Sequence, residues 1–224
     1  MSDVSETPRH RRSKAAQRAE TYELILDAAE YLFSKHGWHG VTLRDVANRA
    51  GVHVSLLHYY FKLKETLFEA VFARRAHISV GRRMEAMDRY EAETGGKPTV
   101  EGALRAFLDT DLDTYFRHGE NWLNYAAFVA SVSNTPAGAA LMDEHFDPVV
   151  LRLISVLKRA MPGVPEDRIF WGYHFVTGAL LNTLARTGRI DRLSGGLCRS
   201  DDYDAITQYM AKFMAAGLTA LAQD

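Results

Sequence analysis

The chain has 224 residues, of which 47% are hydrophobic and 25% are charged, and its formal net charge is −1. These proportions are typical of a soluble globular protein with one large or two small domains, and no apolar run is long enough to span a bilayer. The single cysteine, Cys198, excludes an internal disulfide, and the polar, basic first 20 residues have no apolar segment of the kind that a secretory signal needs, so we expect a cytoplasmic protein.

Positive charge is concentrated in the first part of the chain. Residues 1–83 hold 14 lysines and arginines against 9 aspartates and glutamates, a balance of +5, whereas residues 84–224 hold 13 against 19, a balance of −6. This asymmetry is expected when a nucleic-acid-binding segment is joined to an acidic domain. We interpret residues 1–20 as a flexible basic arm that either contacts DNA phosphates and the minor groove or serves only as a solubilising tail. Its basic residues are Arg9, Arg11, Arg12, Lys14 and Arg18.

A first helix is predicted over residues 14–36, and the most informative stretch, VTLRDVANRAGVHVSLLHYYFKLKE at residues 41–65, follows it. Thr42 is placed to cap a short second helix, with Asp45 as its capping-box partner. Gly51 lies where the end of that helix favours a left-handed residue. A third helix follows over residues 54–59, with Leu57 facing the core. Its outward side chains suit base edges, thymine methyls and phosphates, and they are Val54, Ser55, Leu56, His58 and Tyr59. Two short helices joined in this way form a helix-turn-helix, which places its second helix in the DNA major groove.

Here the sequence resembles the tetracycline-repressor (TetR) family of bacterial regulators, over roughly the first 80 residues. The residues that carry the resemblance are Ile25 to Ala29, Leu32-Phe33, Gly37, Thr42 to Ala47, Ala50 to Val52, Leu57, Tyr60-Phe61 and Lys64 to Leu67. Two positions depart from the family pattern, because His53 and Leu63 stand where a Ser or Thr usually caps a helix, at a cost of about 1 kcal/mol each.

The resemblance implies a set of DNA contacts at matching positions. The residues expected to hold phosphates are Thr42, His58, Tyr60 and Lys64. The residues expected nearer the bases are Arg44, Val54, Ser55 and Tyr59.

The rest of the chain also has helical periodicity and no strong strand pattern. Helices are predicted over residues 64–89, 99–116, 122–133, 137–158 with a possible break at Pro148, 165–186 and 201–221. We therefore predict an all-α protein, with an N-terminal three-helix helix-turn-helix domain at residues 21–66. Residues 67–224 are expected to form a C-terminal helical bundle for effector binding and dimerisation.

Aromatic residues with a few polar neighbours recur at helical spacing in this second half. They form either a packed core or an apolar cavity for a small molecule, and the family resemblance favours a cavity whose ligand moves the fourth helix. The predicted ligand-binding residues are Phe107, Asp111, Tyr115, Trp122, Tyr125, Phe128, Trp171, His174, Phe175 and Asn182. Residues 131–159 also resemble the subset of TetR proteins related to regulators of fatty-acid and polyhydroxyalkanoate metabolism, which favours an acyl or other apolar effector.

The resemblance further implies a homodimer, which we place at residues 165–186 and 201–221. Small residues such as Gly172, Gly178 and Ala179 would allow close helix approach either between subunits or within one chain.

The predicted function is a ligand-responsive transcriptional regulator, most simply a repressor, whose partners are double-stranded operator DNA, a second copy of the chain and a small-molecule effector. No cofactor, metal or membrane is expected to take part. A helical adaptor without a DNA role is one alternative, and an enzyme is another. The enzyme would need a site such as His145 with Asp143, Glu144 and Asp147, but adjacent residues on a helix point in different directions.

Overall fold

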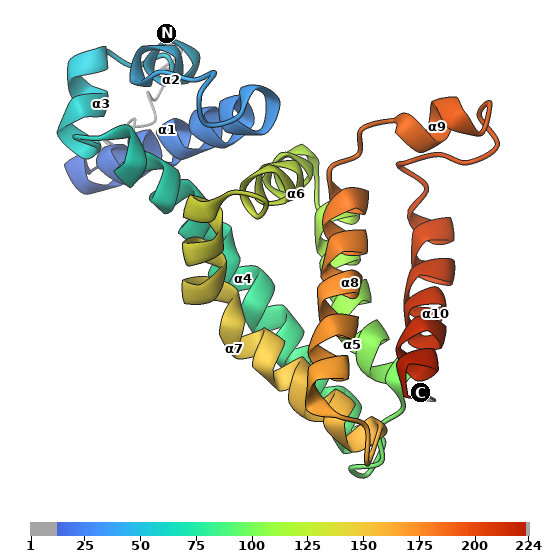
Figure 1. Cartoon of the computed structure of the whole chain (residues 1–224). Helices are drawn as coiled ribbons and strands as arrows, with labels where there is room; N and C mark the ends of the chain where they lie inside the picture. Colours follow the sequence, from blue (N-terminus) through green and yellow to red (C-terminus); the bar gives the residue numbers. More distant parts are fainter. Residues whose placement is uncertain (1–12, 223–224) are drawn as a thin grey trace, which may run out of the picture.

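The computed structural model describes residues 13–222, and its regular structure within that part is entirely helical, which confirms the predicted fold class. The N-terminal helices are α1 (Lys14–His36), α2 (Leu43–Ala50) and α3 (Val54–Tyr60), and α4 (Lys64–Glu93) connects them to the remainder. The C-terminal bundle contains α5 (Val100–Arg117), α6 (Glu120–Val132), α7 (Pro136–Ala160), α8 (Glu166–Leu184), α9 (Arg189–Leu193) and α10 (Tyr203–Leu221). Figure 1 shows α1–α3 grouped at one end of α4, with α7 alongside α4, and α8 and α10 side by side.

Local capping explains where the first helices begin. The Thr42 hydroxyl accepts from the Asp45 amide at 3.2 Å, and the Asp45 carboxylate accepts from the Thr42 amide at 2.9 Å, which completes the predicted capping box. Gly51 has φ 67°, a left-handed conformation that ends α2 without the steric strain of a Cβ. His53 caps α3 only through a long 3.4 Å bond from the Ser55 amide, and Leu63 provides no side-chain cap for α4.

The first helix has its predicted bounds, residues 14–36. The assignment of residues 14–20 to a flexible arm is therefore wrong, because Ser13 caps a helical segment rich in strong helix formers. Arg9, Arg11 and Arg12 lie outside the described residues. Helix α7 runs through Pro148 without ending, and the five-residue α9 was not predicted, because its length gives almost no periodic signal.

The N-terminal helices pack directly onto the bundle. Phe33 of α1 lies 5.1 Å from Phe68 of α4 and 5.9 Å from Phe128 of α6, measured between ring centroids. The expected boundary between residues 66 and 67 therefore falls inside α4, next to the fully buried Leu67. One continuous apolar core joins the two halves.

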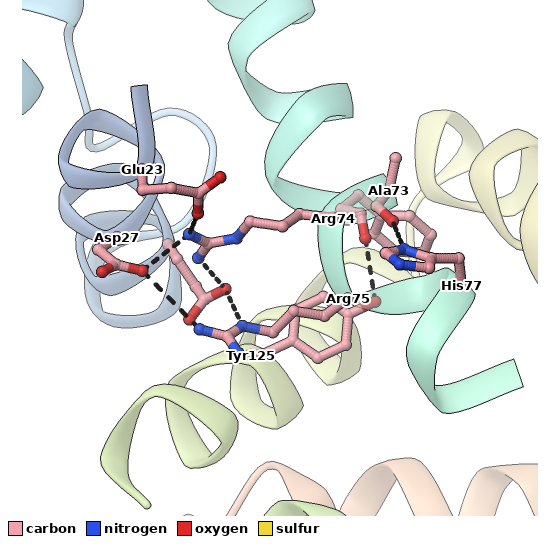
Figure 2. A network of polar contacts seen from close by, with 9 residues as sticks. Glu23, Asp27, Ala73, Arg74, Arg75, His77 and Tyr125 are labelled. Atoms are coloured by element: carbon pink, nitrogen blue, oxygen red, sulfur yellow. Dashed lines mark hydrogen bonds and ion pairs between the residues drawn. The ribbon is translucent and has the colours of Figure 1, made fainter. Parts of the chain in front are cut away.

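A network of ion pairs adds a polar connection between α1 and α4 (Figure 2). The Glu30 carboxylate accepts from Arg74 Nη2 and from Arg75 Nε, both at 2.7 Å, and its side chain is only 1% exposed. Asp27 accepts from Arg74 at 2.8 Å, and Glu23 does so at 3.2 Å. Burial alone would lower the pKa of Arg74, but the Glu30 and Asp27 carboxylates outweigh it and raise that pKa. The orientation of α1 on α4 is thus fixed by charge as well as by aromatic packing.

Candidate DNA-binding surface and ligand cavity

Helix α3 presents its polar side chains to solvent. Leu57 is 0% exposed and fixes the helix against the core, while Tyr59 is 65% exposed. The other outward side chains, at positions where the sequence predicted them, are Val54, Ser55, Leu56 and His58. The Ser55 hydroxyl lies 2.8 Å from Nδ1 of His53, so its orientation is set before any DNA arrives. An exposed helix held against the core by a buried residue is what major-groove insertion needs.

The start of α1 contributes a basic residue to the same surface. The guanidinium of Arg18 lies 5.4 Å from the ring centre of Tyr59 and 5.9 Å from that of Tyr60. The Tyr60 hydroxyl donates to the Arg18 carbonyl at 3.1 Å, which ties α1 to the end of α3. Tyr60, predicted as a phosphate contact, therefore also has a structural role.

Two other predicted phosphate contacts are partly engaged within the protein. The Thr42 hydroxyl donates to Asp45 at 2.6 Å as well as capping α2. The Lys64 ammonium donates to the carbonyls of Trp38 and Val41 and lies 4.2 Å from the Trp38 ring centre. Lys64 thus anchors the loop before α2, which predicts that its removal would disturb the domain as well as any phosphate contact.

Exposed basic side chains border this surface. Arg44, a predicted base contact, is exposed near the start of α2. Lys62, between α3 and α4, is exposed as well and was not among the predicted contacts. Its position directly after Tyr60-Phe61, in a basic loop, is the sequence signal that would have identified it.

A small cavity lies between helices of the bundle. Its volume is about 20 Å³, and its lining includes Phe107, Asp111 and Tyr115 from the predicted set. A space of that size holds about one water molecule. Any larger ligand must therefore displace side chains.

A buried polar cluster lies at one side of this cavity. Arg83 of α4 forms an ion pair with Asp111 of α5, and Ser79 donates to Asp111 at 2.7 Å and lies 3.2 Å from the Tyr115 hydroxyl. Burial lowers the pKa of Arg83 and raises that of Tyr115. Arg83 Nε is buried without a hydrogen-bond partner among the described residues. Neither Arg83 nor Ser79 was predicted, because the partner that allows a charged residue to be buried is distant in sequence.

The other predicted ligand-binding residues lie in two different environments. Trp122, Tyr125 and Phe128 are buried in α6 and pack in the core rather than lining the cavity. The remaining four face away from the cavity on the outer side of α8, and they are Trp171, His174, Phe175 and Asn182. The prediction for these four is not supported, because α8 buries the neighbouring stripe of Ile169, Gly172, Val176 and Leu180 instead.

Within residues 13–222, no group of three or more His, Cys, Asp or Glu side chains is arranged to hold a metal ion. His145 packs with its ring centre 5.6 Å from that of Phe72. In the same part of the chain, no helix is long and apolar enough to cross a membrane.

An exposed helix-turn-helix that a long helix joins to a helical bundle defines a class of protein, the DNA-binding regulators of transcription. Comparison with known families identifies the particular one. Residues 25–71 match the model of bacterial regulatory proteins of the tetR family, and residues 105–217 match the tetracyclin repressor-like C-terminal domain. The chain belongs to the TetR family.

Individual relatives agree with this assignment. The chain is 25% identical over 186 residues to the HTH-type transcriptional regulator BetI of Escherichia coli, covering 83% of this chain and 92% of that protein. It is 29% identical over 100 residues to the HTH-type transcriptional activator FasR of Mycolicibacterium smegmatis, covering 45% and 44%.

Solved structures show the same fold at low identity. The fatty acid degradation regulator FadR from Bacillus halodurans has a TM-score of 0.58 at 15% identity, over 88% of this chain and 95% of that one. FadR from Bacillus subtilis, in complex with stearoyl-CoA, has a TM-score of 0.55 at 15% identity, over 88% and 98%.

Proposed function

We propose that the protein is a homodimeric transcriptional repressor that a small, largely apolar effector releases from its operator. The observation that carries the proposal is the outward display of Ser55, His58 and Tyr59 on a helix that Leu57 fixes from beneath. Basic side chains border this display, as phosphate binding requires.

The DNA role is tested by separating base contacts from phosphate contacts. Selection from random duplexes should give a different preferred sequence for Tyr59→Ala than for the original protein. Lys62→Ala should weaken binding to all duplexes about equally and reduce the slope of log K against log salt by roughly one. A helical adaptor would show no salt-dependent binding to any duplex, and that result would refute the DNA role.

The second copy is proposed to bind the outer stripes of α8 and α10. Trp171 and Phe175 of α8 are 59% and 56% exposed, and Phe213 of α10 is 73% exposed. Ala216 and Gly217 of α10 are exposed as well. Exposed aromatic side chains on two helices that pack together are typical of a protein interface. A two-fold dimer would present two copies of α3 to half-sites about 34–36 Å apart.

Dimerisation is tested by placing a charge in this surface. Phe213→Glu should convert a dimer to a monomer in light scattering and lower operator affinity. Leu151→Glu is the matched control, because Leu151 is 57% exposed but lies on α7. A dimer that persists in Phe213→Glu, or dissociates equally in both variants, would refute this interface.

The effector is proposed to enter the bundle around the Arg83–Asp111 pair. The surrounding side chains are mainly apolar, and they include the flexible Met142. A ligand carboxylate would offer Arg83 a second anionic partner, which fits an acyl chain with an acidic head. This proposal also agrees with the stearoyl-CoA bound to one structural neighbour.

The need for an acidic head group is tested with two ligands that share the same alkyl chain and differ only in the head group. Decanoate should bind at least roughly tenfold more tightly than decanol, because a charge-assisted hydrogen bond contributes about 1.5–3 kcal/mol. Arg83→Met should abolish this preference, and Arg82→Met should keep it, because Arg82 bonds Thr114 outside the cavity. Equal binding of the two ligands would refute the acidic head.

A further inference from the structure

A second and much larger hollow lies between the DNA-binding helices and the bundle. It has a volume of about 1000 Å³ and opens to solvent along one side. Its walls come from the loop after α1, from the first turns of α4 and from the segment that joins α6 to α7. Figure 1 shows α7 alongside α4 on this side of the molecule. Hollows of this size commonly hold small molecules.

The floor of this interdomain groove is apolar. Phe68 and Ala73 of α4 face Val132 at the end of α6 and Leu141 of α7. Trp38 closes the end nearest α2, with its ring 4.9 Å from that of Phe68. These side chains fit the body of an apolar molecule.

The rim of the groove is acidic. Glu65 and Glu69 lie one turn apart on α4, and Glu144 lies opposite them on α7. All three are exposed, and none forms a hydrogen bond or ion pair with another residue in the described part of the chain. Among the described residues, no lysine or arginine lines the groove, whereas His39 and His145 do.

Three carboxylates that lie between helices in the described part of the chain are paired with arginines. Glu30 binds two arginines, Asp111 binds Arg83, and Glu91 binds Arg152. The three rim glutamates differ in that they carry negative charge at the border of an apolar groove, with His39 and His145 as the other ionisable side chains of its lining. Three like charges at one rim repel one another, and a bound cation would relieve that repulsion.

We propose that the interdomain groove is a binding site for organic cations with an apolar body. The apolar part would rest on the floor between Phe68 and Leu141, and the positive centre would lie among Glu65, Glu69 and Glu144. This site is separate from the bundle cavity around Arg83, and its ligand carries the opposite charge. A molecule bound there touches both the loop that Lys64 anchors and helix α7.

Two ions of nearly equal shape and opposite charge test the proposal. In calorimetry, tetraphenylphosphonium should bind the full-length protein and tetraphenylborate should bind at least roughly tenfold more weakly. Charge at about 4 Å in water contributes about 1 kcal/mol, or about fivefold in affinity. Glu69→Gln should therefore weaken tetraphenylphosphonium binding about fivefold, and the triple change with Glu65→Gln and Glu144→Gln should weaken it more than roughly thirtyfold.

Two further variants locate the site. Glu93→Gln makes the same charge change at an exposed position at the far end of α4, and it should leave the affinity within about twofold. Ala140→Trp fills the groove from an exposed position and should prevent binding. Equal binding of the two ions, no binding of the cation, or unchanged affinity in the triple variant or in Ala140→Trp would overturn the proposal.

Discussion

Replacing Glu30 by Gln should destabilise the protein more than any other single neutralisation on α1. One oxygen of this carboxylate accepts from two arginines of α4, and the side chain is 1% exposed. Removing one partner of a buried ion pair costs about 3–5 kcal/mol, because the remaining charge is left without compensation. The amide oxygen of Gln keeps one acceptor but no charge, so we expect a loss of about 2–4 kcal/mol. For a chain of this size that loss lowers Tm by roughly 5–15 °C.

The matched control is Asp27→Asn, which removes the same charge from the same network. The Asp27 side chain is 43% exposed, so solvent screens its pairing with Arg74 and the loss should stay within about 1 kcal/mol. Urea unfolding followed by circular dichroism measures both variants, and equal slopes would show that the unfolded states are comparable. If Glu30→Gln lowered the free energy of unfolding no more than Asp27→Asn, the conclusion that the buried Glu30 carboxylate is the main polar contact between α1 and α4 would be refuted.

Three further outcomes follow from local geometry. Leu57→Ala should lower stability by about 2–5 kcal/mol in thermal unfolding, because it leaves a cavity beneath α3. Gly172→Ala should lower the free energy of unfolding by about 1–3 kcal/mol, since the new Cβ would lie 2.1 Å from a leucine methyl of α10. The control is Gly81→Ala, which has open space around it and should be neutral or stabilising by up to about 1 kcal/mol. The side-chain hydrogen bond from Thr42 lowers the pKa of Asp45 in the folded state. The ionised Asp45 therefore stabilises the fold at pH values above the ordinary aspartate pKa, and this stabilisation is lost as the pH falls through the lowered pKa. The stability difference between Asp45→Asn and the original protein should shrink accordingly in acid unfolding scans.

The sequence was sufficient for the helix-turn-helix because each local signal there agrees with the others. Thr42, Asp45 and Gly51 define the ends of α2 through their own side chains and backbone, without help from distant residues. The outward set on α3 followed from one inward residue, Leu57, because a seven-residue helix has room for only one buried stripe. Agreement between capping, turn and periodicity is what makes a local structure predictable.

The same reasoning failed on α8 because that helix has two apolar stripes. Ile169, Val176 and Leu180 form one stripe, and Trp171 with Phe175 forms the other, so periodicity alone does not show which one faces inward. Choosing the larger aromatic side chains gave the wrong face for the cavity. The aliphatic stripe is buried because it includes Gly172, which allows Leu218 of α10 to approach closely. That contact joins positions 46 residues apart, and a small residue alone does not show whether the helix that approaches it belongs to the same chain or to a second subunit.

Helix α4 connects the bundle to the DNA-binding helices, so we expect it to transmit the effect of a ligand bound in the bundle. It is unbroken over 30 residues, and three sets of polar contacts along it engage different neighbours. Arg83 pairs with α5, Arg74 and Arg75 pair with α1, and Lys64 holds the loop before α2. From Arg83 to Lys64 the helix rises about 28 Å. A ligand that shifts the Arg83 end can therefore reorient the far end only if the ion pairs between α1 and α4 hold the two helices rigidly together.

We expect Glu30→Gln to weaken this coupling in addition to lowering stability. The measured quantity is the operator affinity without a bundle ligand divided by the operator affinity with the ligand bound, and this ratio should fall. Asp27→Asn should keep that ratio, and an unchanged ratio in Glu30→Gln, measured by fluorescence anisotropy at a temperature where both variants are folded, would show that the coupling bypasses this joint.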